Sequence, residues 1–260
     1  MSLYVIMILI GIFTGVVTGL TGASGVMVVV PLVNMFLNFS IHEAIGTSLM
    51  VDVMAPLAIS FVYYRHGNVD MKSGIWIAIG SILGAQLGAF FAADMSGVGL
   101  GSAFGIFMIL MGILIWRKGL HHESLAKKMK KVAKFETKFQ RLVMALILGF
   151  LIGLMTGILG AGGGGMILLI LIFVLNFSLH IAIGTSALIM AITACSGAIG
   201  YALQGNINLL AGLIIGISAA ISGMVSAKYA NKVNEKILSK AVGVIFVALG
   251  IIMSILQVGG

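Results

Sequence analysis

Few side chains in this sequence could do chemistry, and they stand alone among apolar residues. Asp52 is the one acid in the middle of an apolar stretch. A carboxylate inside a membrane is expensive and by default functional. We predict that Asp52 binds a coupling ion, H⁺ or Na⁺; the alternative is a protonated acid that is hydrogen-bonded within a helix bundle.

Two histidines and two Thr-Ser pairs recur at matching places. His42 and His180 each stand near the start of an apolar stretch, where they serve either in proton coupling or as satisfied helix-end residues. Hydroxyl side chains in helices often bond to their own backbone, and the alternative is that they face a substrate. The four hydroxyl residues are Thr47, Ser48, Thr185 and Ser186.

Two glycine clusters interrupt the apolar sequence, GVVTGLTGASG at 15–25 and GLMTGILGAGG at 153–163. A run such as residues 161–165 breaks a helix, because each glycine costs about 1 kcal/mol relative to alanine. At membrane depth such a break is tolerated where it is buried in protein or lines a wet cavity. The helix that restarts aims free N–H groups at that cavity, which suits a small anion.

The residues that we predict to bind this anion come from both clusters and from the hydroxyl pairs. The cluster residues are Thr21, Gly22, Ser24, Gly25, Gly160, Gly162, Gly163 and Gly164. The earlier glycines of each cluster are expected instead to allow close packing of helices. These are Gly15, Gly19, Gly153 and Gly157.

An internal repeat explains why these features occur twice. Residues 15–74 match residues 153–212 in one register without a gap, and LNFSIHEAIGTS in the first half corresponds to LNFSLHIAIGTS in the second. A repeat of this kind must be found before any fold is assigned. In an apolar chain it indicates transporter architecture.

The composition predicts an all-α integral membrane protein in a lipid bilayer. The chain is 60% hydrophobic and 8% charged, whereas soluble domains have about 25% charged residues. Apolar stretches of about 20 residues recur, which is the length that crosses a bilayer. The net charge of +8 does not indicate nucleic acid, because the basic residues fall in loops and beside apolar spans, as at a membrane surface.

The basic residues also predict the topology. The fifteen Lys and Arg residues lie at 65–72, 117–141 and 228–240, and positive loops stay in the cytoplasm. When the spans are followed from these cytoplasmic loops, both termini lie outside. Equivalent loops of the two halves then lie on opposite sides of the membrane. We therefore predict two inverted repeats, residues 1–116 and 142–260, joined by a basic cytoplasmic linker at 117–141.

Inversion requires an odd number of crossings in each half. The opening segments, 3–37 and 141–176, are too long for one helix of about 20 residues. We expect each to form a broken helical hairpin of two short arms, spanning or re-entrant, followed by three transmembrane helices. One long opening helix would instead give four crossings and place residues 228–240 outside.

The glycine clusters followed by N-F-S-x-H-x-A-I-G-T-S resemble the sulfite exporter TauE/SafE family of membrane permeases. The resemblance implies secondary transport, in the inner membrane, of a small sulfur-containing or organic anion such as sulfite, sulfoacetate or another sulfonate. The family has G-x-G-G-G followed by Pro-x-Leu. The first half keeps Pro31 but lacks the glycine run, and the second keeps the glycines but has Leu169 in place of proline.

The sequence thus predicts a secondary transporter that works by alternating access and holds the anion between the two breaks. A passive anion channel and a non-transporting membrane assembly subunit remain as alternatives. The oligomeric state is left open between monomer and homodimer.

Overall fold

The apolar stretches form helices. The computed structural model describes residues 3–21, 24–118, 138–160, 164, 166–167, 170–171, 175, 177, 179–229 and 235–258, and these ranges contain no strand. The predicted all-α class is therefore confirmed. The helices are α1 (Leu3–Thr21), α2 (Val26–Leu37), α3 (Ile41–Arg65), α4 (Met71–Ala93), α5 (Gly97–Lys118), α7 (Lys138–Leu159), α9 (Leu179–Leu203), α10 (Leu209–Tyr229) and α11 (Glu235–Val258).

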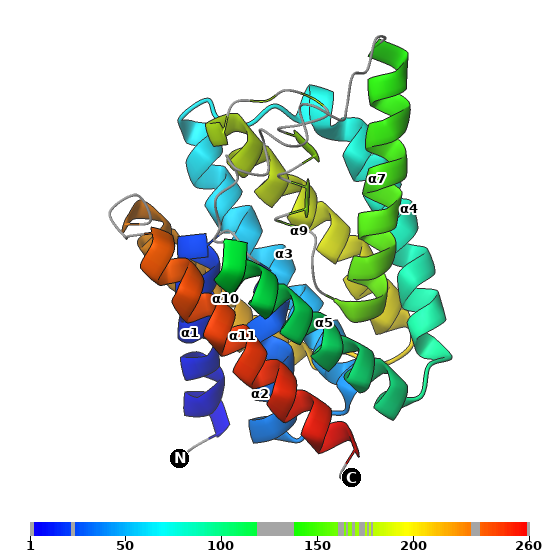
Figure 1. Ribbon diagram of the computed structural model, residues 1–260, viewed down its shortest axis with the longest axis vertical. Coiled ribbons are helices and arrows are strands. Elements are labelled where there is room, and N and C mark those ends of the chain that lie inside the picture. The colour runs from blue at the N-terminus through cyan, green and yellow to red at the C-terminus, as the bar shows by residue number, and fades with distance from the viewer. Residues whose placement is uncertain are drawn as a thin grey trace.

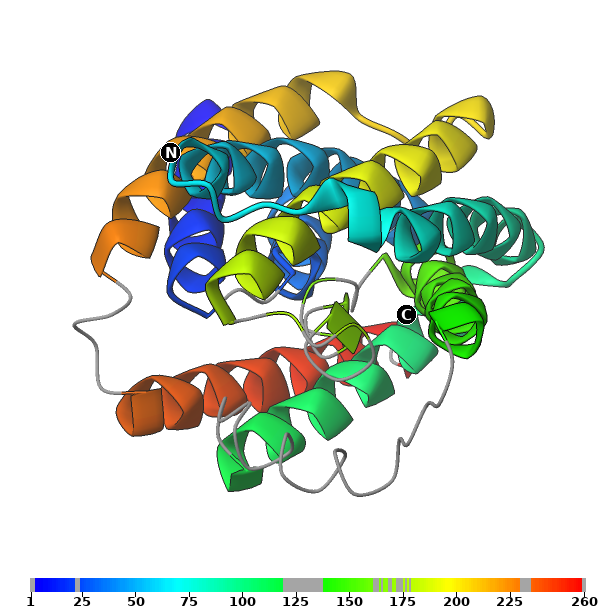
Figure 2. The same ribbon diagram turned by 90° about the horizontal axis from the view of Figure 1, so that it is seen from above.

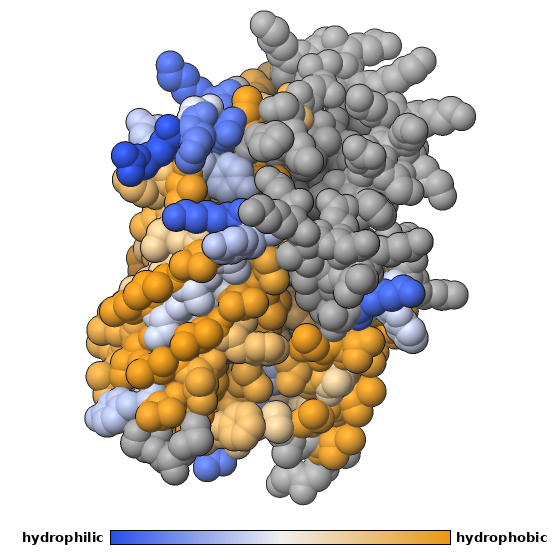
Figure 3. All heavy atoms as spheres, turned by 90° about the vertical axis from the view of Figure 1, so that its left-hand side faces the viewer, coloured by the Kyte–Doolittle hydropathy of each residue, from blue (hydrophilic) through white to orange (hydrophobic). Residues whose placement is uncertain are grey.

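Seven of these helices are long and apolar enough to cross a membrane: α1, α3, α4, α5, α7, α9 and α10. Large apolar side chains cover their outer surfaces, with Leu57, Phe61 and Leu83 each about half exposed. Figure 3 shows a broad hydrophobic band below a hydrophilic upper rim. Such an apolar surface is unfavourable in water, whereas the hydrocarbon core of a bilayer is equally apolar. The chain is a multi-pass membrane protein.

Helix ends follow local chemistry. Asn38 has a φ of 54° and ends α2 in the left-handed conformation, which asparagine tolerates. Ser40 then caps α3 by accepting a hydrogen bond of 3.2 Å from the backbone N–H of Glu43. Gly67 and Gly205, with φ of 71° and 74°, occupy equivalent turns after α3 and α9. These local signals repeat because the sequence repeats.

The opening segment of the first half is a hairpin, but its arms are unequal. Figure 1 shows α1 running away from the N-terminus and α2 running back. Helix α1 has 19 residues and α2 has 12, or roughly 28 Å and 18 Å at 1.5 Å per residue. The predicted broken hairpin is confirmed for the first half, and of the two possibilities left open, spanning or re-entrant, its first arm is long enough to span. Most of the corresponding second arm lies outside the described residues.

The two repeats interlock through their opening helices. Helix α7 packs on α4 of the first repeat, with Gly80 against Leu146 and Gly88 against Leu154. Helix α1 packs in the same way on α10 of the second repeat, with Gly11 against Ile215. Because the paired positions advance together, each pair is parallel. Each opening helix thus completes the other repeat.

Equivalent helices run in opposite directions within the bundle. Gly105 of α5 lies against Gly250 of α11, and Gly112 lies against Gly243, so these two equivalent helices are antiparallel. Figure 1 shows that α3 and α9 also run in opposite directions. Figure 2 shows α5 and α11 side by side in the lower part of the view, with α3 and α9 in a separate layer above them. Repeats inverted across a membrane would have this arrangement.

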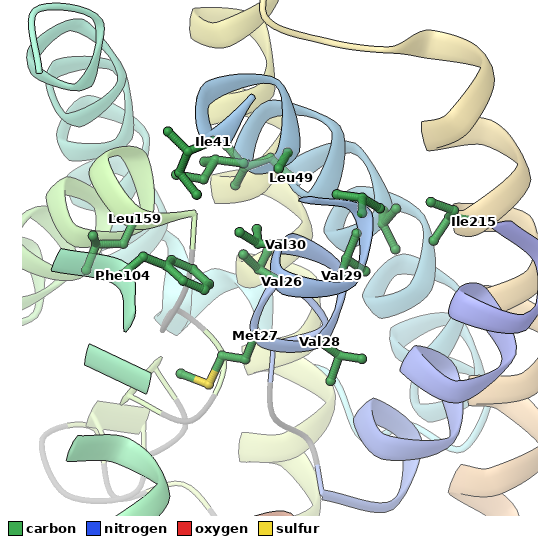
Figure 4. Packing of buried hydrophobic residues seen from close by; sticks show 14 of the residues in the cluster. Val26, Met27, Val28, Val29, Val30, Ile41, Leu49, Phe104, Leu159 and Ile215 are labelled. Atoms are coloured by element: carbon green, nitrogen blue, oxygen red, sulfur yellow. The ribbon is translucent and has the colours of Figure 1, made fainter. Parts of the chain in front are cut away.

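The short helix α2 lies in the centre of the core. Val26, Val28, Val29 and Val30 are completely buried, and Figure 4 shows them surrounded by side chains from α3, α5, α7 and α10. The first two turns of α2 are apolar on every side, and such a segment is stable where it is enclosed on every side. The start of α2 is therefore held inside the protein rather than at a membrane surface.

Candidate functional site

The first helix break is held by Asp52. The Asp52 carboxylate, in the middle of α3, accepts a hydrogen bond of 2.9 Å from the backbone N–H of Gly25 and a second from the Ser24 hydroxyl. The backbone N–H of Val26 in turn donates to Ser24 Oγ at 3.3 Å. The acid thus binds the loop between α1 and α2, and the first N–H groups of α2 find acceptors.

The carboxylate that caps the start of α2 comes from α3, because the N-cap residue of α2 cannot supply an acceptor. Gly25 is the N-cap of α2 and has no side chain to accept a hydrogen bond. The N-terminus of a helix carries about half a positive charge, which favours a nearby anion. Asp52 is 2% exposed and Ser24 4% exposed. In the part of the chain described, no Lys, Arg or His side chain pairs with Asp52.

Two threonines of α1 complete the surroundings of this break. Thr14 and Thr18 are buried, and the hydroxyl oxygen of each lacks a hydrogen-bond partner among the described residues. A Cβ added to Gly25 would lie 3.3 Å from Thr18 Oγ1, 3.0 Å from Asp52 Oδ1 and 2.7 Å from Thr14 Cγ2. Glycine is needed at this position because α1, the break and α3 converge there.

The second break touches the first. Gly160 follows α7 with a φ of 69°. A Cβ there would lie 3.1 Å from Val26 Cγ1, 2.9 Å from Ile45 Cγ2 and 3.7 Å from Ser48 Oγ. Gly160 therefore lies against the first residue of α2 and against α3. Gly164 is helical and buried.

Some predicted site residues cannot be located. Gly22, Gly162 and Gly163 lie outside the described residues, as do the side chains of Thr21 and His180. Their assignment to a binding site stays a prediction.

Thr47 and Thr185 join the repeats in the same way. Thr47 Oγ1 accepts a hydrogen bond of 3.0 Å from the backbone N–H of Asn208, and Thr185 Oγ1 accepts one of 2.9 Å from the backbone N–H of Asp70. Asp70 and Asn208 are equivalent residues, so the two bonds are related by the repeat. Each threonine holds the loop before α4 or α10 of the other repeat. Substrate binding by these threonines stays a prediction.

The glycine before each threonine lets that loop approach. A Cβ on Gly46 would lie 2.0 Å from the carbonyl oxygen of Asn206, and one on Gly184 would lie 2.2 Å from that of Asn68. Any larger residue would displace backbone. The I-G-T-S motif of each half thus serves a contact between repeats.

The neighbouring serines bond to their own helix. Ser48 Oγ donates to the carbonyl of Ile45 at 2.7 Å, and Ser186 Oγ donates to that of Ile183 at 3.0 Å. The expectation of backbone bonding is confirmed for both serines. Such a hydroxyl keeps lone pairs, so substrate contact by Ser48 and Ser186 is not tested by these bonds.

His42 and Asp52 are not brought together. His42 Nε2 lies 3.0 Å from the carbonyl oxygen of Ala92, at the end of α4. Ten residues of helix separate His42 from Asp52, or roughly 15 Å. The alternative of a satisfied helix-end residue fits this contact, and a coupling role for His42 stays a prediction.

Thr14 and Thr18 are not predicted as site residues from the sequence. A threonine in an apolar helix usually bonds to its own backbone, so its residue type alone does not indicate a site. One signal was available: Thr18 and Thr156 are equivalent, and the hydroxyl of Thr156 also lacks a partner in the described ranges. The same threonine stands beside each break.

The arrangement can hold small ions inside a bundle of membrane-spanning helices. Comparison with known proteins agrees with this chemistry: the sulfite exporter TauE/SafE family matches residues 7–253. The chain belongs to this family. Relatives include the "Probable membrane transporter protein YunE" of Bacillus subtilis strain 168, which is 26% identical over 226 residues, or 82% of this chain and 83% of the relative.

Two further comparisons complete this picture. The "Probable membrane transporter protein YdhB" of the same organism is 27% identical over 246 residues, or 91% of this chain and 94% of the relative. No solved structure matches the chain. Relatives that the chain matches over 83% and 94% of their length are thus named as probable membrane transporters.

Proposed function

We propose that this TauE/SafE protein is a secondary transporter that moves a small anion of the sulfite or sulfonate class across the inner membrane by alternating access. The contact between the two breaks carries the proposal, since Gly160 lies against Val26 and Ser48 in the buried centre of the bundle. Breaks near the midplane of inverted repeats are where transporters bind substrate.

The antiparallel direction of equivalent helices supports an inverted topology. Arg65, Lys72 and Lys228 lie at the ends of α3, α4 and α10 that share the upper side of the bundle in Figure 1, and both termini lie on the lower side. By the positive-inside rule the upper side is cytoplasmic and the termini are outside. Cysteine substitutions at Asp94 and Lys72 test this: labelling by an impermeant reagent should occur from outside at position 94 and from inside at position 72.

Coupling to H⁺ or Na⁺ is assigned to Asp52. A carboxylate with no basic partner in the described chain is suited to an ion that binds and leaves during transport. The anion is bound and released unchanged, so the proposed role is not enzymatic.

Flux through the purified chain in liposomes is the direct test. Radiolabelled sulfite and sulfoacetate should enter with saturation, faster with a gradient of H⁺ or Na⁺ than without one. Empty liposomes give the background. Absence of saturable flux for any small anion tested would reject the proposal, and flux that rises linearly without dependence on Asp52 would favour a passive channel.

Two glycine variants test the contact between the breaks. Gly160→Ala adds a methyl group against Val26 and Ile45, whereas Gly205→Ala carries similar backbone strain but meets nothing within 4 Å. We expect Gly160→Ala to reduce flux about tenfold or more, since misplacing binding groups by about 1 Å costs that much. Equal flux from the two variants at equal stability would argue against a site between the breaks.

A further inference from the structure

The two helix breaks differ in one coordinated way that goes beyond their glycines. At the first break, Thr14 and Asp52 are polar and buried. At the equivalent positions of the second repeat stand Ile152 and Met190, which belong to one buried apolar cluster. The Thr18 position is threonine in both repeats. An acid and two threonines thus stand at the first break, whereas the equivalent positions hold one threonine and two apolar residues.

In the part of the chain that the structure describes, no basic side chain balances the charge at the first break. Asp52 accepts hydrogen bonds from the Ser24 hydroxyl and the Gly25 N–H, both neutral donors. The partial positive charge at the start of α2 offsets part of a carboxylate charge. A buried charge requires a partner of opposite sign or loses its charge. A charged Asp52 carboxylate therefore requires one further positive charge beside it.

The Thr18 hydroxyl indicates what carries that charge. It makes no bond to its own helix, whereas Thr14, one turn before it on α1, turns its methyl group toward the place of a Cβ on Gly25. Thr18 Oγ1 and Asp52 Oδ1 both lie close to the place of a Cβ on Gly25, at 3.3 and 3.0 Å. A proton on Asp52 would need only the carboxylate, whereas hydroxyl oxygens with free lone pairs are ligands for a hard metal cation.

We propose that Asp52, Ser24 and Thr18 form a Na⁺ site at the break between α1 and α2, with no equivalent of the acid in the second repeat. One carboxylate and neutral oxygens match a monovalent cation in charge. The ion fixes the start of α2 against α1 and α3. The site rests on the proposed function only for its role in coupling, because binding itself can be measured without transport.

Thermal unfolding of the purified full-length protein in detergent measures binding directly. Sodium chloride should raise the Tm saturably relative to potassium chloride or choline chloride at equal ionic strength. Asp52→Asn should abolish the sodium effect. Thr18→Val keeps the side-chain shape and should weaken Na⁺ binding about tenfold, as expected for loss of one bond to a charged group.

Thr156→Val is the matched control. It removes the equivalent buried hydroxyl from α7, in the repeat where Met190 stands at the position of Asp52, and should leave the sodium concentration for half-maximal stabilisation unchanged. If Asp52→Asn does not fold, Ser24→Ala and Thr18→Val provide the comparison. Equal stabilisation by all three chloride salts, or equal effects of Thr18→Val and Thr156→Val, would overturn the Na⁺ site.

Flux measurements separate this inference from the proposed function. Saturable anion flux in sodium-free buffer, driven by a proton gradient and lost in Asp52→Asn, would overturn the Na⁺ site and leave the transporter standing. Specific stabilisation by sodium in a protein without anion flux would support the site and reject the transporter. Sodium stabilisation together with sodium-dependent flux would support both.

Discussion

The α1–α10 pair and the α4–α7 pair occupy equivalent places in the two repeats but pack with different chemistry. The opening helices α1 and α7 both place glycines at the contact, at equivalent positions. These glycines are Gly11, Gly15 and Gly19 on α1, and Gly149, Gly153 and Gly157 on α7. The expectation that the glycines at 15, 19, 153 and 157 allow close packing is confirmed.

The partner helices have diverged. Helix α10 has serines where α4 has glycines: Ser218, Ser222 and Ser226 correspond to Gly80, Gly84 and Gly88. Ser226 Oγ donates to the carbonyl of Gly15 at 3.2 Å. A Cβ on Gly84, by contrast, would lie 2.1 Å from the carbonyl oxygen of Phe150. Close backbone approach was kept in both pairs, and polar bonding was added to one.

On their other faces, α4 and α10 show the opposite polarity. Helix α4 joins α9 through polar bonds, including Ser81 to Thr193 at 2.6 Å and Gln86 Nε2 to the Ser196 carbonyl at 2.7 Å. Helix α10 meets α3 through apolar side chains, beside a cavity of about 700 Å³ whose lining includes Met54. Each of these helices therefore has one hydrogen-bonded face and one apolar face. Helix α4 is hydrogen-bonded toward α9, whereas α10 is hydrogen-bonded toward α1.

The largest effect is expected from Gly153→Val in the α4–α7 pair. The new Cβ would lie 2.1 Å from the carbonyl oxygen and 2.6 Å from the Cα of Ser81, and backbone cannot move aside cheaply. We expect the free energy of unfolding in detergent to fall by about 3 kcal/mol or more. Gly67→Ala, where nothing lies within 4 Å, should cost only about 1 kcal/mol of backbone strain. Similar losses from both variants would contradict the close α4–α7 contact.

Exchanging glycine and serine at equivalent positions of α4 and α10 should cost different amounts of unfolding free energy in the two directions. Gly84→Ser introduces the side chain that α10 carries at Ser222, but against a backbone oxygen, and should cost about 2 kcal/mol of unfolding free energy. Ser222→Gly should cost about 1 kcal/mol, mainly through helix propensity. The measurement is denaturant unfolding in mixed micelles. A neutral Gly84→Ser would contradict the close backbone contact between α4 and α7.

The polar α4–α9 interface should be sensitive to Gln86→Leu. This variant loses the two bonds from Gln86 to Ser196, at 2.7 and 3.1 Å, and should lower the unfolding free energy by about 1 to 2 kcal/mol. Met224→Leu changes the equivalent residue on α10 and should cost less than about 1 kcal/mol. A larger loss from Met224→Leu would reverse the comparison between the two faces.

The smallest effect is expected from Ser226→Ala. It removes the bond to Gly15, and a hydrogen bond between helices in a membrane is worth roughly 0.6 kcal/mol. Ser218→Ala is the control, since Ser218 bonds to the Ile214 carbonyl of its own helix at 2.8 Å. A double-mutant cycle of Ser226→Ala with Gly15→Ala would show coupling only if the two helices touch there.

Local features of the fold could be predicted from the sequence, because they depend on neighbouring residues. Asn38 ends α2 and Ser40 caps α3, since each uses backbone groups within a few positions. The unusual position of Asp52 could also be recognised from the sequence, because an acid in an apolar span has few explanations. Its partners Ser24 and Gly25 lie more than 25 positions away, and spacing alone does not identify them.

Several properties of this protein can be read from its amino-acid sequence alone: it is helical, embedded in a membrane, built from a repeat and interrupted by two glycine clusters. Those properties follow from apolar length, helix propensity and identity between residues in a fixed register. Other properties are visible only in three dimensions: each opening helix packs on the other repeat, Thr47 bonds to Asn208, and Thr18 lies close to Asp52. Such contacts depend on which surfaces fit in three dimensions. The first break, with its oxygen-lined carboxylate, therefore became distinct from its equivalent only when α1, α2 and α3 were seen together.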